Sequence, residues 1–362
     1  MTDRLSPFGW DDRWSDHLAA YLASPESAEV IDPVVGRVVR HDGAGLMVAT
    51  DEGTVRAMFG PPVTPPPVVG DWVVIDRHQT PQATLPRYSL LRRRAAGGDG
   101  EQALVANVDV VLVVCGLDRP VRIGRIQRTV TLAHDAGAEP IVVLTKADKA
   151  DPAVAAVAEQ VVAEADPSLE VITLSAQGGW GVDELLERVG QRTVALIGES
   201  GAGKSTLVNA LVADADDVAA TGVVRDGDAK GRHTTTSRQL HLLSGGGVLV
   251  DTPGIREVGV FADAEAVAET FPEIDELAEQ CRFRDCAHQS EPGCAVQAAV
   301  ESGELEAGRV ERWRTLDAEA AAAELRSDPV ESRRRGRQFG RMAREAQREK
   351  DLRRGTDPDQ QS

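Results

Sequence analysis

The sequence has 362 residues and a formal net charge of −18, and 42% of its side chains are hydrophobic. This length predicts two or three domains, each with its own core. The negative charge disfavours broad attraction to nucleic acid, so any such contact must come from local basic patches. Because no apolar run approaches the roughly 18 residues of a membrane span, and the N-terminus lacks the apolar core of a signal peptide, we expect a cytoplasmic protein.

The first third of the chain changes character near residue 33. Residues 1–32 mix helix-compatible and charged residues, and we expect an N-terminal extension of uncertain order. Residues 33–95 instead hold short strands between glycine turns, predicted at 36–40, 46–49, 54–59 and 70–75. Several short strands in about 60 residues are typical of a small closed barrel, and the OB-fold has the fitting size. Such a barrel binds RNA or docks a protein, and the residues leave both open.

Residues 95–101 have the composition of a linker, and an α/β domain is predicted over residues 103–262. Continuous apolar runs at 108–114 and 140–144 are typical of strands buried on both faces of a parallel sheet, with a helix predicted between them at 125–136. Further strands complete an alternating strand and helix series, and they are predicted at 170–174, 193–197 and 247–250. A doubly wound sheet of this kind binds its ligand beyond the carboxyl ends of its strands.

A phosphate-binding loop follows the strand at 193–197. The stretch from Gly198 to Ser205 reads GESGAGKS, which matches GxxxxGKS, and it leads into an apolar helix. Glycines allow backbone N–H groups to surround a polyphosphate, and the positive end of the helix points at it. We predict that Lys204 reaches the terminal phosphates and is catalytic, and that the Ser205 hydroxyl binds Mg²⁺. The residues predicted to contact the nucleotide here are Gly198, Glu199, Ser200, Gly201, Ala202, Gly203, Lys204, Ser205 and Thr206.

Two loops at other strand ends are predicted to read the base. Thr145-Lys146-Ala147-Asp148 resembles the NKxD element of GTPases, with Thr145 in place of the usual Asn. The Asp148 carboxylate can accept both the ring N–H and the exocyclic amine of guanine, whereas adenine would present an acceptor to it. Lys146 is predicted to lie along the base plane and the Thr145 hydroxyl to tether the loop. Ser175-Ala176-Gln177 resembles the SA[KQ] element, with Ser175 and Ala176 beside the guanine, so the predicted ligand is GTP.

The strand at 247–250 ends in Asp251-Thr252-Pro253-Gly254, which matches the DxxG element. Asp251 is predicted to hold Mg²⁺ through water, and the Gly254 N–H to sense the γ-phosphate. The polar segment Gly231-Arg232-His233-Thr234-Thr235-Thr236 is predicted to be a switch that closes on Mg²⁺. Thr235 is favoured as the Mg²⁺ ligand, with Thr234 as the alternative.

The trigger for hydrolysis is predicted to be unusual. Ras-like proteins carry a Gln after the DxxG glycine that orients the attacking water, but here that position is Ile255, which can neither donate nor accept. We therefore expect slow intrinsic turnover. His233, in the predicted switch, is the nearest candidate for aligning the water, and the alternative is an ordinary surface histidine.

Three cysteines and a histidine are clustered near the C-terminus. Cys281, Cys286, His288 and Cys294 form a Cx4CxHx5C array. Three thiolates and one imidazole suit tetrahedral Zn²⁺, and a full protein shell leaves no position for a catalytic water, so one structural zinc is predicted. The remaining cysteine, Cys115, is expected to be a free core residue.

Helices are predicted at 296–314 and 318–326, within a zinc-binding helical domain over residues 263–330. A tail follows at 331–362. Its stretch from 331 to 354 holds ten Lys/Arg against four Asp/Glu, a balance of +6, which predicts contact with RNA or, alternatively, a solvated charged helix.

The order of these motifs is permuted, because the base-reading loops precede the phosphate loop instead of following it. A permuted GTPase behind a small β-barrel and before a Cys₃His array resembles the ribosome small-subunit-dependent GTPase A (RsgA) family, over about residues 34–350. The resemblance implies a cytoplasmic, monomeric GTPase that binds the 30S subunit and its rRNA late in subunit maturation and is stimulated by it. The alternative is a GTP-gated module for a protein or metal partner without RNA contact, and Asp148 disfavours an ATP-using enzyme.

Overall fold

The computed structural model describes residues 4–41, 45–94, 101–213, 239–251, 264–283 and 286–327. At its centre lies the sheet of an α/β unit, in which the predicted apolar runs form strands. These strands are β8 (Val110–Gly116), β9 (Glu139–Thr145), β10 (Glu170–Thr173), β11 (Thr193–Gly198), β12 (Gln239–Leu242) and β13 (Val248–Asp251). β10, β9, β8, β11 and β13 pair in parallel in that order, and β12 adds an antiparallel strand beside β13.

Helices cover both faces of this sheet. They are α2 (Ile123–Asp135), α3 (Pro152–Ala165), α4 (Val182–Val189) and α5 (Lys204–Leu211). α2 and α3 bury apolar side chains in one hydrophobic cluster with alternate strand residues such as Val111 and Val113, while α4 and α5 pack with Leu112 and Val114 on the opposite face. Because successive strand residues point to opposite faces, strands with a layer on each side must be apolar throughout, as β8 is.

The N-terminal β-unit consists of β1 (Val34–His41), β2 (Gly45–Thr50), β3 (Gly53–Met58), β4 (Trp72–Ile75) and β5 (Pro81–Thr84). The pairings run β3-β2-β1-β4-β5, and β1 also pairs with β12 through Arg40 and Gln239. The two units therefore share one 11-stranded sheet. A separate hairpin of β6 (Leu90–Arg94) and β7 (Glu101–Ala106) joins them along the chain.

The N-terminal segment is packed against the β-unit, which sequence patterns did not predict. α1 (Asp12–Leu22) begins at the N-cap Asp11, whose carboxylate accepts from the Trp14 N–H. Trp10 and Trp14 are buried, and their ring centroids lie 4.8 and 5.7 Å from that of Trp72. Aromatic burial of this kind contributes strongly to a core, so residues 4–32 are a structural part of the β-unit.

A buried arginine joins the β-unit to the α/β unit. Arg37 on β1 is 1% exposed, and its guanidinium donates to Thr193 Oγ1 at 2.9 Å, to the Asn107 and Gly70 carbonyls at 3.2 Å and to the Phe8 carbonyl. Burial lowers the pKa of Arg37 from its usual value. Because a buried guanidinium without acceptors is costly, these carbonyls and the hydroxyl fix the two units against each other.

The C-terminal unit is helical, with α7 (Ala264–Thr270), α8 (Pro272–Ala278), α9 (Ala295–Ser302) and α10 (Ala307–Ser327). The prediction of one helix over 296–314 was wrong, because Gly303 adopts a left-handed φ of 79° and ends α9. The predicted break before residue 318 was also wrong. Leu316 is buried in this unit's core, and α10 runs through it.

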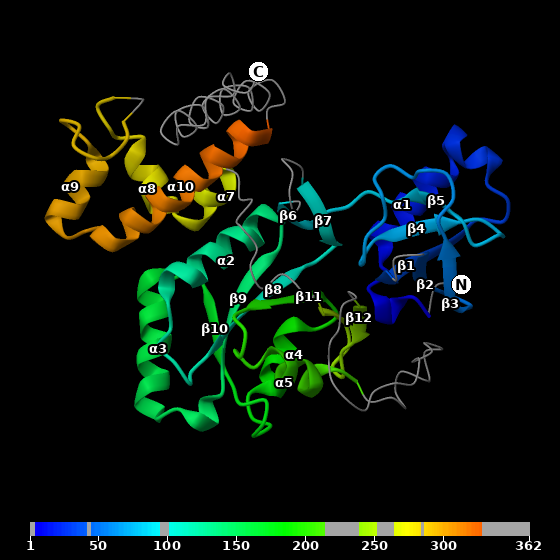
Figure 1. The fold of residues 1–362 in the computed structure, drawn as a ribbon, viewed down its shortest axis with the longest axis horizontal. Helices are drawn as coiled ribbons and strands as arrows, with labels where there is room; N and C mark the ends of the chain where they lie inside the picture. The colour runs from blue at the N-terminus through cyan, green and yellow to red at the C-terminus, as the bar shows by residue number, and fades with distance from the viewer. Residues whose placement is uncertain are drawn as a thin grey trace, which may run out of the picture.

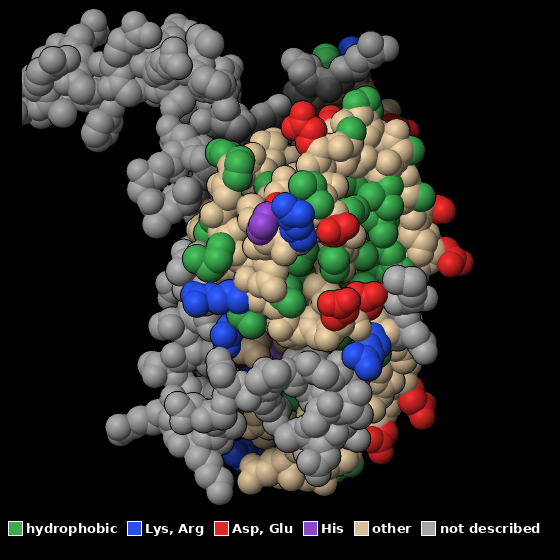
Figure 2. Space-filling view, turned by 90° about the vertical axis from the view of Figure 1, so that its right-hand side faces the viewer, with side chains coloured by type: hydrophobic (Ala, Val, Ile, Leu, Met, Phe, Trp, Pro, Cys, Tyr) green, Lys and Arg blue, Asp and Glu red, His purple; other side chains and the backbone are tan. Residues whose placement is uncertain are grey.

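Figure 1 shows the C-terminal helices and the N-terminal β-unit on opposite sides of the central sheet. α7 packs on α2, where the Thr270 hydroxyl donates to Thr131 Oγ1 at 3.0 Å. Figure 2 views the side that carries the β-unit, where hydrophobic side chains are exposed. Met58 and Phe59 are about half exposed there, at 50% and 49%. No helix that the structure describes is both long and apolar enough to cross a membrane.

Candidate nucleotide site and candidate metal centre

The phosphate loop joins β11 to α5. Gly198 lies against β8, where a Cβ would stand 2.3 Å from the Val114 carbonyl oxygen, so only glycine fits. Gly203 has a left-handed φ of 90° and caps α5, which begins at Lys204. Lys204 Nζ donates to the carbonyls of Gly198 and Glu199, both at 2.5 Å. The Lys204 ammonium group thus lies over the backbone of the phosphate loop, at the amino end of α5.

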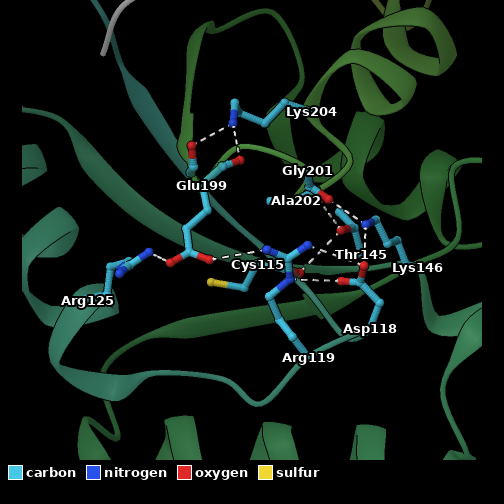
Figure 3. Close-up of polar contacts among 11 residues, drawn as sticks. Cys115, Asp118, Arg119, Arg125, Thr145, Lys146, Glu199, Gly201, Ala202 and Lys204 are labelled. Carbon is cyan, nitrogen blue, oxygen red and sulfur yellow. Dashed lines mark hydrogen bonds and ion pairs between the residues drawn. The ribbon is translucent and has the colours of Figure 1, made fainter. Parts of the chain in front are cut away.

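The Thr145–Asp148 loop is hydrogen-bonded to the phosphate loop. The Thr145 hydroxyl, 2% exposed, donates to the Ala202 carbonyl at 2.5 Å and lies 3.2 Å from the Cys115 carbonyl. Lys146, at a left-handed φ of 60°, donates from Nζ to the Gly201 carbonyl and to Asp118 Oδ2 at 2.7 Å. Figure 3 shows these contacts, which hold the two loops together. The hydroxyl that replaces the usual Asn side chain therefore does tether this loop.

The third predicted loop lies beside Asp148. The Ser175 hydroxyl, fully buried, donates to Asp148 Oδ1 at 2.6 Å and accepts from the Gly178 N–H at 2.9 Å. Parallel pairing of β9 with β10 puts both strand ends at the same edge of the sheet. Thr145, Lys146, Asp148, Ser175 and Ala176 are thus gathered beside residues 198–206, as the motif pattern predicts.

A charged network beside the phosphate loop was missed by sequence reasoning. Asp118 and Arg119 follow β8, and Arg119 lies 3.3 Å from Asp118 and 3.7 Å from Glu199, which also pairs with Arg125 of α2 (Figure 3). The hydrogen bond from Lys146, followed by that from Arg119, lowers the pKa of Asp118 to about 2. The sequence could have indicated this network, because β8 is predicted as a parallel strand and its carboxyl end therefore also lies at the ligand-binding edge of the sheet.

The predicted Mg²⁺ ligands are only partly described. Ser205 lies in the first turn of α5 and Asp251 ends β13, and β11 and β13 are neighbours in the sheet. Both residues therefore lie at the edge that carries the phosphate loop. His233, Thr235 and Gly254 lie outside the described residues.

The four predicted metal ligands form one cluster in the C-terminal unit. One ligand atom from each of Cys281, Cys286, His288 and Cys294 lies within 4.8 Å of all the others, so the cluster could hold a metal ion. Cys281 Sγ and Cys294 Sγ lie 3.9 Å apart, and His288 Nδ1 lies 3.4 and 3.5 Å from them.

Backbone groups of the same unit support the cluster. Cys294 is the N-cap of α9, so its sulfur accepts from the Gln297 N–H at 3.4 Å, while Cys281 Sγ accepts from the Ala295 N–H at 3.3 Å. Burial opposes the charged form of Cys281, but hydrogen bonds from the Ala295 and Val296 N–H groups lower the pKa of its thiol overall. His288, at a left-handed φ of 55°, has its carbonyl held by the side chains of Gln297 and Arg314.

Cys115 is not part of that cluster. It lies on β8 near the phosphate loop, and burial raises the pKa of its thiol to about 11. A raised pKa keeps the thiol protonated at neutral pH, so Cys115 behaves as a packing residue.

Comparison with solved structures gives the class of protein. The YjeQ crystal structure from Thermotoga maritima matches with a TM-score of 0.59 and 28% identity, covering 80% of this chain and 99% of that one. YloQ, described as a circularly permuted GTPase, matches with a TM-score of 0.57 and 23% identity, covering 82% of this chain and 97% of that one. The α/β unit therefore has the fold of a circularly permuted GTPase.

Sequence comparison gives the family. The RsgA GTPase family model matches residues 84–261. A Streptomyces coelicolor protein named small ribosomal subunit biogenesis GTPase RsgA is 46% identical, with 95% of this chain and 96% of that protein covered. The chain belongs to the RsgA GTPase family.

Proposed function

We propose that this GTPase is a biogenesis factor for the small (30S) ribosomal subunit, that it acts in the cytoplasm as a monomer, and that the subunit stimulates its GTP hydrolysis. The observation that carries the proposal is the 46% identity, over 95% of the chain, to a relative named for that process. The alignment covers nearly the whole chain and is not confined to the GTPase core.

The nucleotide site supports guanine as the base. Ser175 holds one oxygen of Asp148, which orients the carboxylate, and a carboxylate at this position pairs with the ring N–H and amine of guanine. Lys204 and the loop N–H groups bind the phosphates, and Mg²⁺ is held by Ser205, Thr235 and Asp251 in this proposal. When bound, Mg²⁺ neutralises developing negative charge on the phosphates. Gly254 senses the γ-phosphate and His233 aligns the attacking water.

The division into units supports the proposed architecture. We assign β1 to β5 as an OB-fold barrel, because five strands with β1 paired on both sides match that topology. The proposed domains are an N-terminal extension at 1–32, the barrel at 33–95, the GTPase domain at 103–262, the zinc-binding domain at 263–330 and a basic tail at 331–362. In this assignment the barrel and the tail contact rRNA.

The Cys₃His cluster fits Zn²⁺. Tetrahedral bonds of about 2.3 Å to sulfur and about 2.0 Å to nitrogen separate two sulfurs by about 3.8 Å and a sulfur from a nitrogen by about 3.5 Å. The observed separations of 3.9, 3.4 and 3.5 Å agree with those values. Four protein ligands complete the shell, so the proposed zinc is structural, with one ion per chain.

The proposal is tested by GTP turnover with and without purified 30S subunits, together with co-sedimentation in GTP-analogue and GDP states. We expect slow turnover alone, a large stimulation by subunits, and binding that depends on the nucleotide. Turnover and sedimentation that are both indifferent to the subunit would favour the GTP-gated module without RNA contact.

A further inference from the structure

An arginine-lined groove of about 590 Å³ lies where the GTPase domain meets the C-terminal unit. Arg122, Arg125 and Arg128 line it from the start of α2, and Arg312 lines it from α10. Ile123 and Leu316 contribute apolar surface between them. The lining contains no acidic side chain, although the whole chain carries a net charge of −18. The lining of the groove is therefore basic, on a chain that is acidic overall.

Glutamates outside the groove hold three of these arginines. Arg128 pairs with Glu319 at 2.8 Å, Arg312 pairs with Glu306 at 3.0 Å, and Arg125 pairs with Glu199. Each pair is partly exposed, so it contributes little to folding stability. A carboxylate occupies at most two of the five N–H donors of a guanidinium, and the rest remain available to a ligand.

Arg122 differs from the other three. It is exposed, and its side chain makes no hydrogen bond or ion pair with any residue in the described part of the chain. The groove thus contains one unpaired cation beside three that are already oriented. Because the glutamates restrict the rotamers of those three, a ligand would lose less side-chain entropy on binding than at three mobile arginines.

We propose that this groove binds the phosphate backbone of RNA, and the inference rests on the proposed function at the 30S subunit. Arginine matches phosphate through paired N–H donors. Arg125 and Arg128 lie three residues apart on α2, about 4.5 Å along its axis, and Arg122 is the N-cap residue just before the helix. Such a row of cations suits a polyanion better than one small anion. No aromatic residue lines the groove, so it offers no stacking surface for bases. Contact is therefore with the backbone and independent of base sequence.

α10, which carries Arg312, has equal numbers of basic and acidic residues, and the basic part of the chain follows it in sequence. That helix ends at Ser327, and the most basic stretch of the sequence begins at Arg333. A phosphate backbone seated against Arg312 would thus lie on the helix that leads toward that stretch.

The test uses the full chain with Arg122→Gln and Arg312→Gln combined, because in the described part of the chain neither side chain makes a hydrogen bond or ion pair with the phosphate loop. The matched control is Arg188→Gln with Arg192→Gln, two partly exposed, ion-paired arginines that meet at Glu139 and lie outside the groove. Affinity for purified 30S subunits and for protein-free small-subunit rRNA is measured in the GTP-analogue state across a salt series. Turnover without RNA checks that each variant is folded.

We expect the groove variant to bind both probes about tenfold more weakly, with the slope of log affinity against log salt reduced by about 1.4 to 1.8 for two lost phosphate contacts. The control should match the wild type. Unchanged rRNA affinity and salt slope in the groove variant would overturn the inference, as would weaker binding to 30S subunits with normal binding to free rRNA, which indicates an acidic protein surface. A wild type that binds free rRNA but not subunits would instead overturn the proposed function.

Discussion

The nucleotide site takes its residues from separate strand ends between Asp118 and Asp251, whereas the metal cluster takes all four donors from the short segment between Cys281 and Cys294. The two sites also differ in what holds them together. In the nucleotide site, Thr145 and Lys146 bond to the phosphate loop directly, so the protein itself supplies the links. In the metal cluster, the four donor atoms converge on one point, and three thiolates so close repel one another without a cation.

From this difference we expect the fold to be stable without a nucleotide, whereas the stability of the C-terminal unit should depend on its metal. The sheet positions the nucleotide loops whether or not a nucleotide is bound. An ion bound by the metal cluster would offset the repulsion among its thiolates, so metal binding would contribute directly to folding of the C-terminal unit. Variants in one site should therefore leave the other unaffected.

The largest effect is expected from Lys204→Ala. Removing the cation that reaches the terminal phosphates should lower GTP turnover by at least about 100-fold, on the scale of other lost charge-stabilising groups. Thermal stability and metal content should stay near wild type. Lys149→Ala, which changes an exposed lysine, is the control and should keep normal turnover. Full activity of Lys204→Ala would show that the phosphates bind elsewhere.

Loss of the metal should have the opposite effects, lowering stability and leaving GTP turnover near that of the wild type. Cys286→Ser, or treatment with a strong chelator, should remove the ion and destabilise the C-terminal unit by several kcal/mol. Elemental analysis and calorimetry measure the two changes. Cys115→Ala, at the cysteine outside the cluster, should retain one metal ion per chain. An unaltered melting profile in metal-free protein would contradict the distinction between the two sites.

Asp148→Asn should weaken GTP binding by about 10- to 100-fold, because the amide places a donor where guanine also donates. Binding of xanthine nucleotide should improve in the same variant. Asp151→Asn is a close control, since Asp151 caps α3 through the Ala153 N–H and asparagine caps a helix equally well. Equal preference for GTP over ATP in Asp148→Asn and wild type would disprove the base assignment.

The smallest effect is expected from Asp118→Asn. Loss of the ion pair with Lys146 should raise KM for GTP about fivefold with little change in kcat, because this partly exposed carboxylate only positions the lysine. Its lowered pKa means that the charged pair is intact above pH 4 and is lost only as the pH falls toward 2. Wild-type affinity should then show no Asp118 titration between pH 5 and 8. A large fall in kcat would show that Asp118 acts on the chemistry.

Sequence patterns were sufficient to predict the elements that depend only on the residues of one short segment. The apolar runs of β8 and β9, the GxxxxGKS turn and the Cx4CxHx5C spacing each carry their own physical signature. The Thr145 tether was also predictable, because a hydroxyl at a strand end can reach a neighbouring carbonyl.

The parts that could not be predicted depend on distant partners. α1 was not foreseen because Trp10 and Trp14 are buried against residues far along the chain, such as Trp72, about 60 residues away. Arg37 looks like a surface residue until the Thr193 hydroxyl and the Asn107 carbonyl are placed around it. The Asp118, Arg119 and Glu199 network needs the sheet order, which places the end of β8 beside the phosphate loop.

The pairing of β1 with β12 also bears on how the chain folds as it is synthesised. Arg40 and Gln239 are neighbours in the sheet although about 200 residues separate them, so this contact forms late and at a high cost in chain entropy. Until residue 242 has been made, the end of β1 near Arg40 lacks this partner, although β2 and β4 pair with the strand, and an unpaired strand edge is a template for pairing with another chain. The N-terminal half is then most prone to aggregation in fragments that stop short of β12, and least prone once the shared sheet is complete.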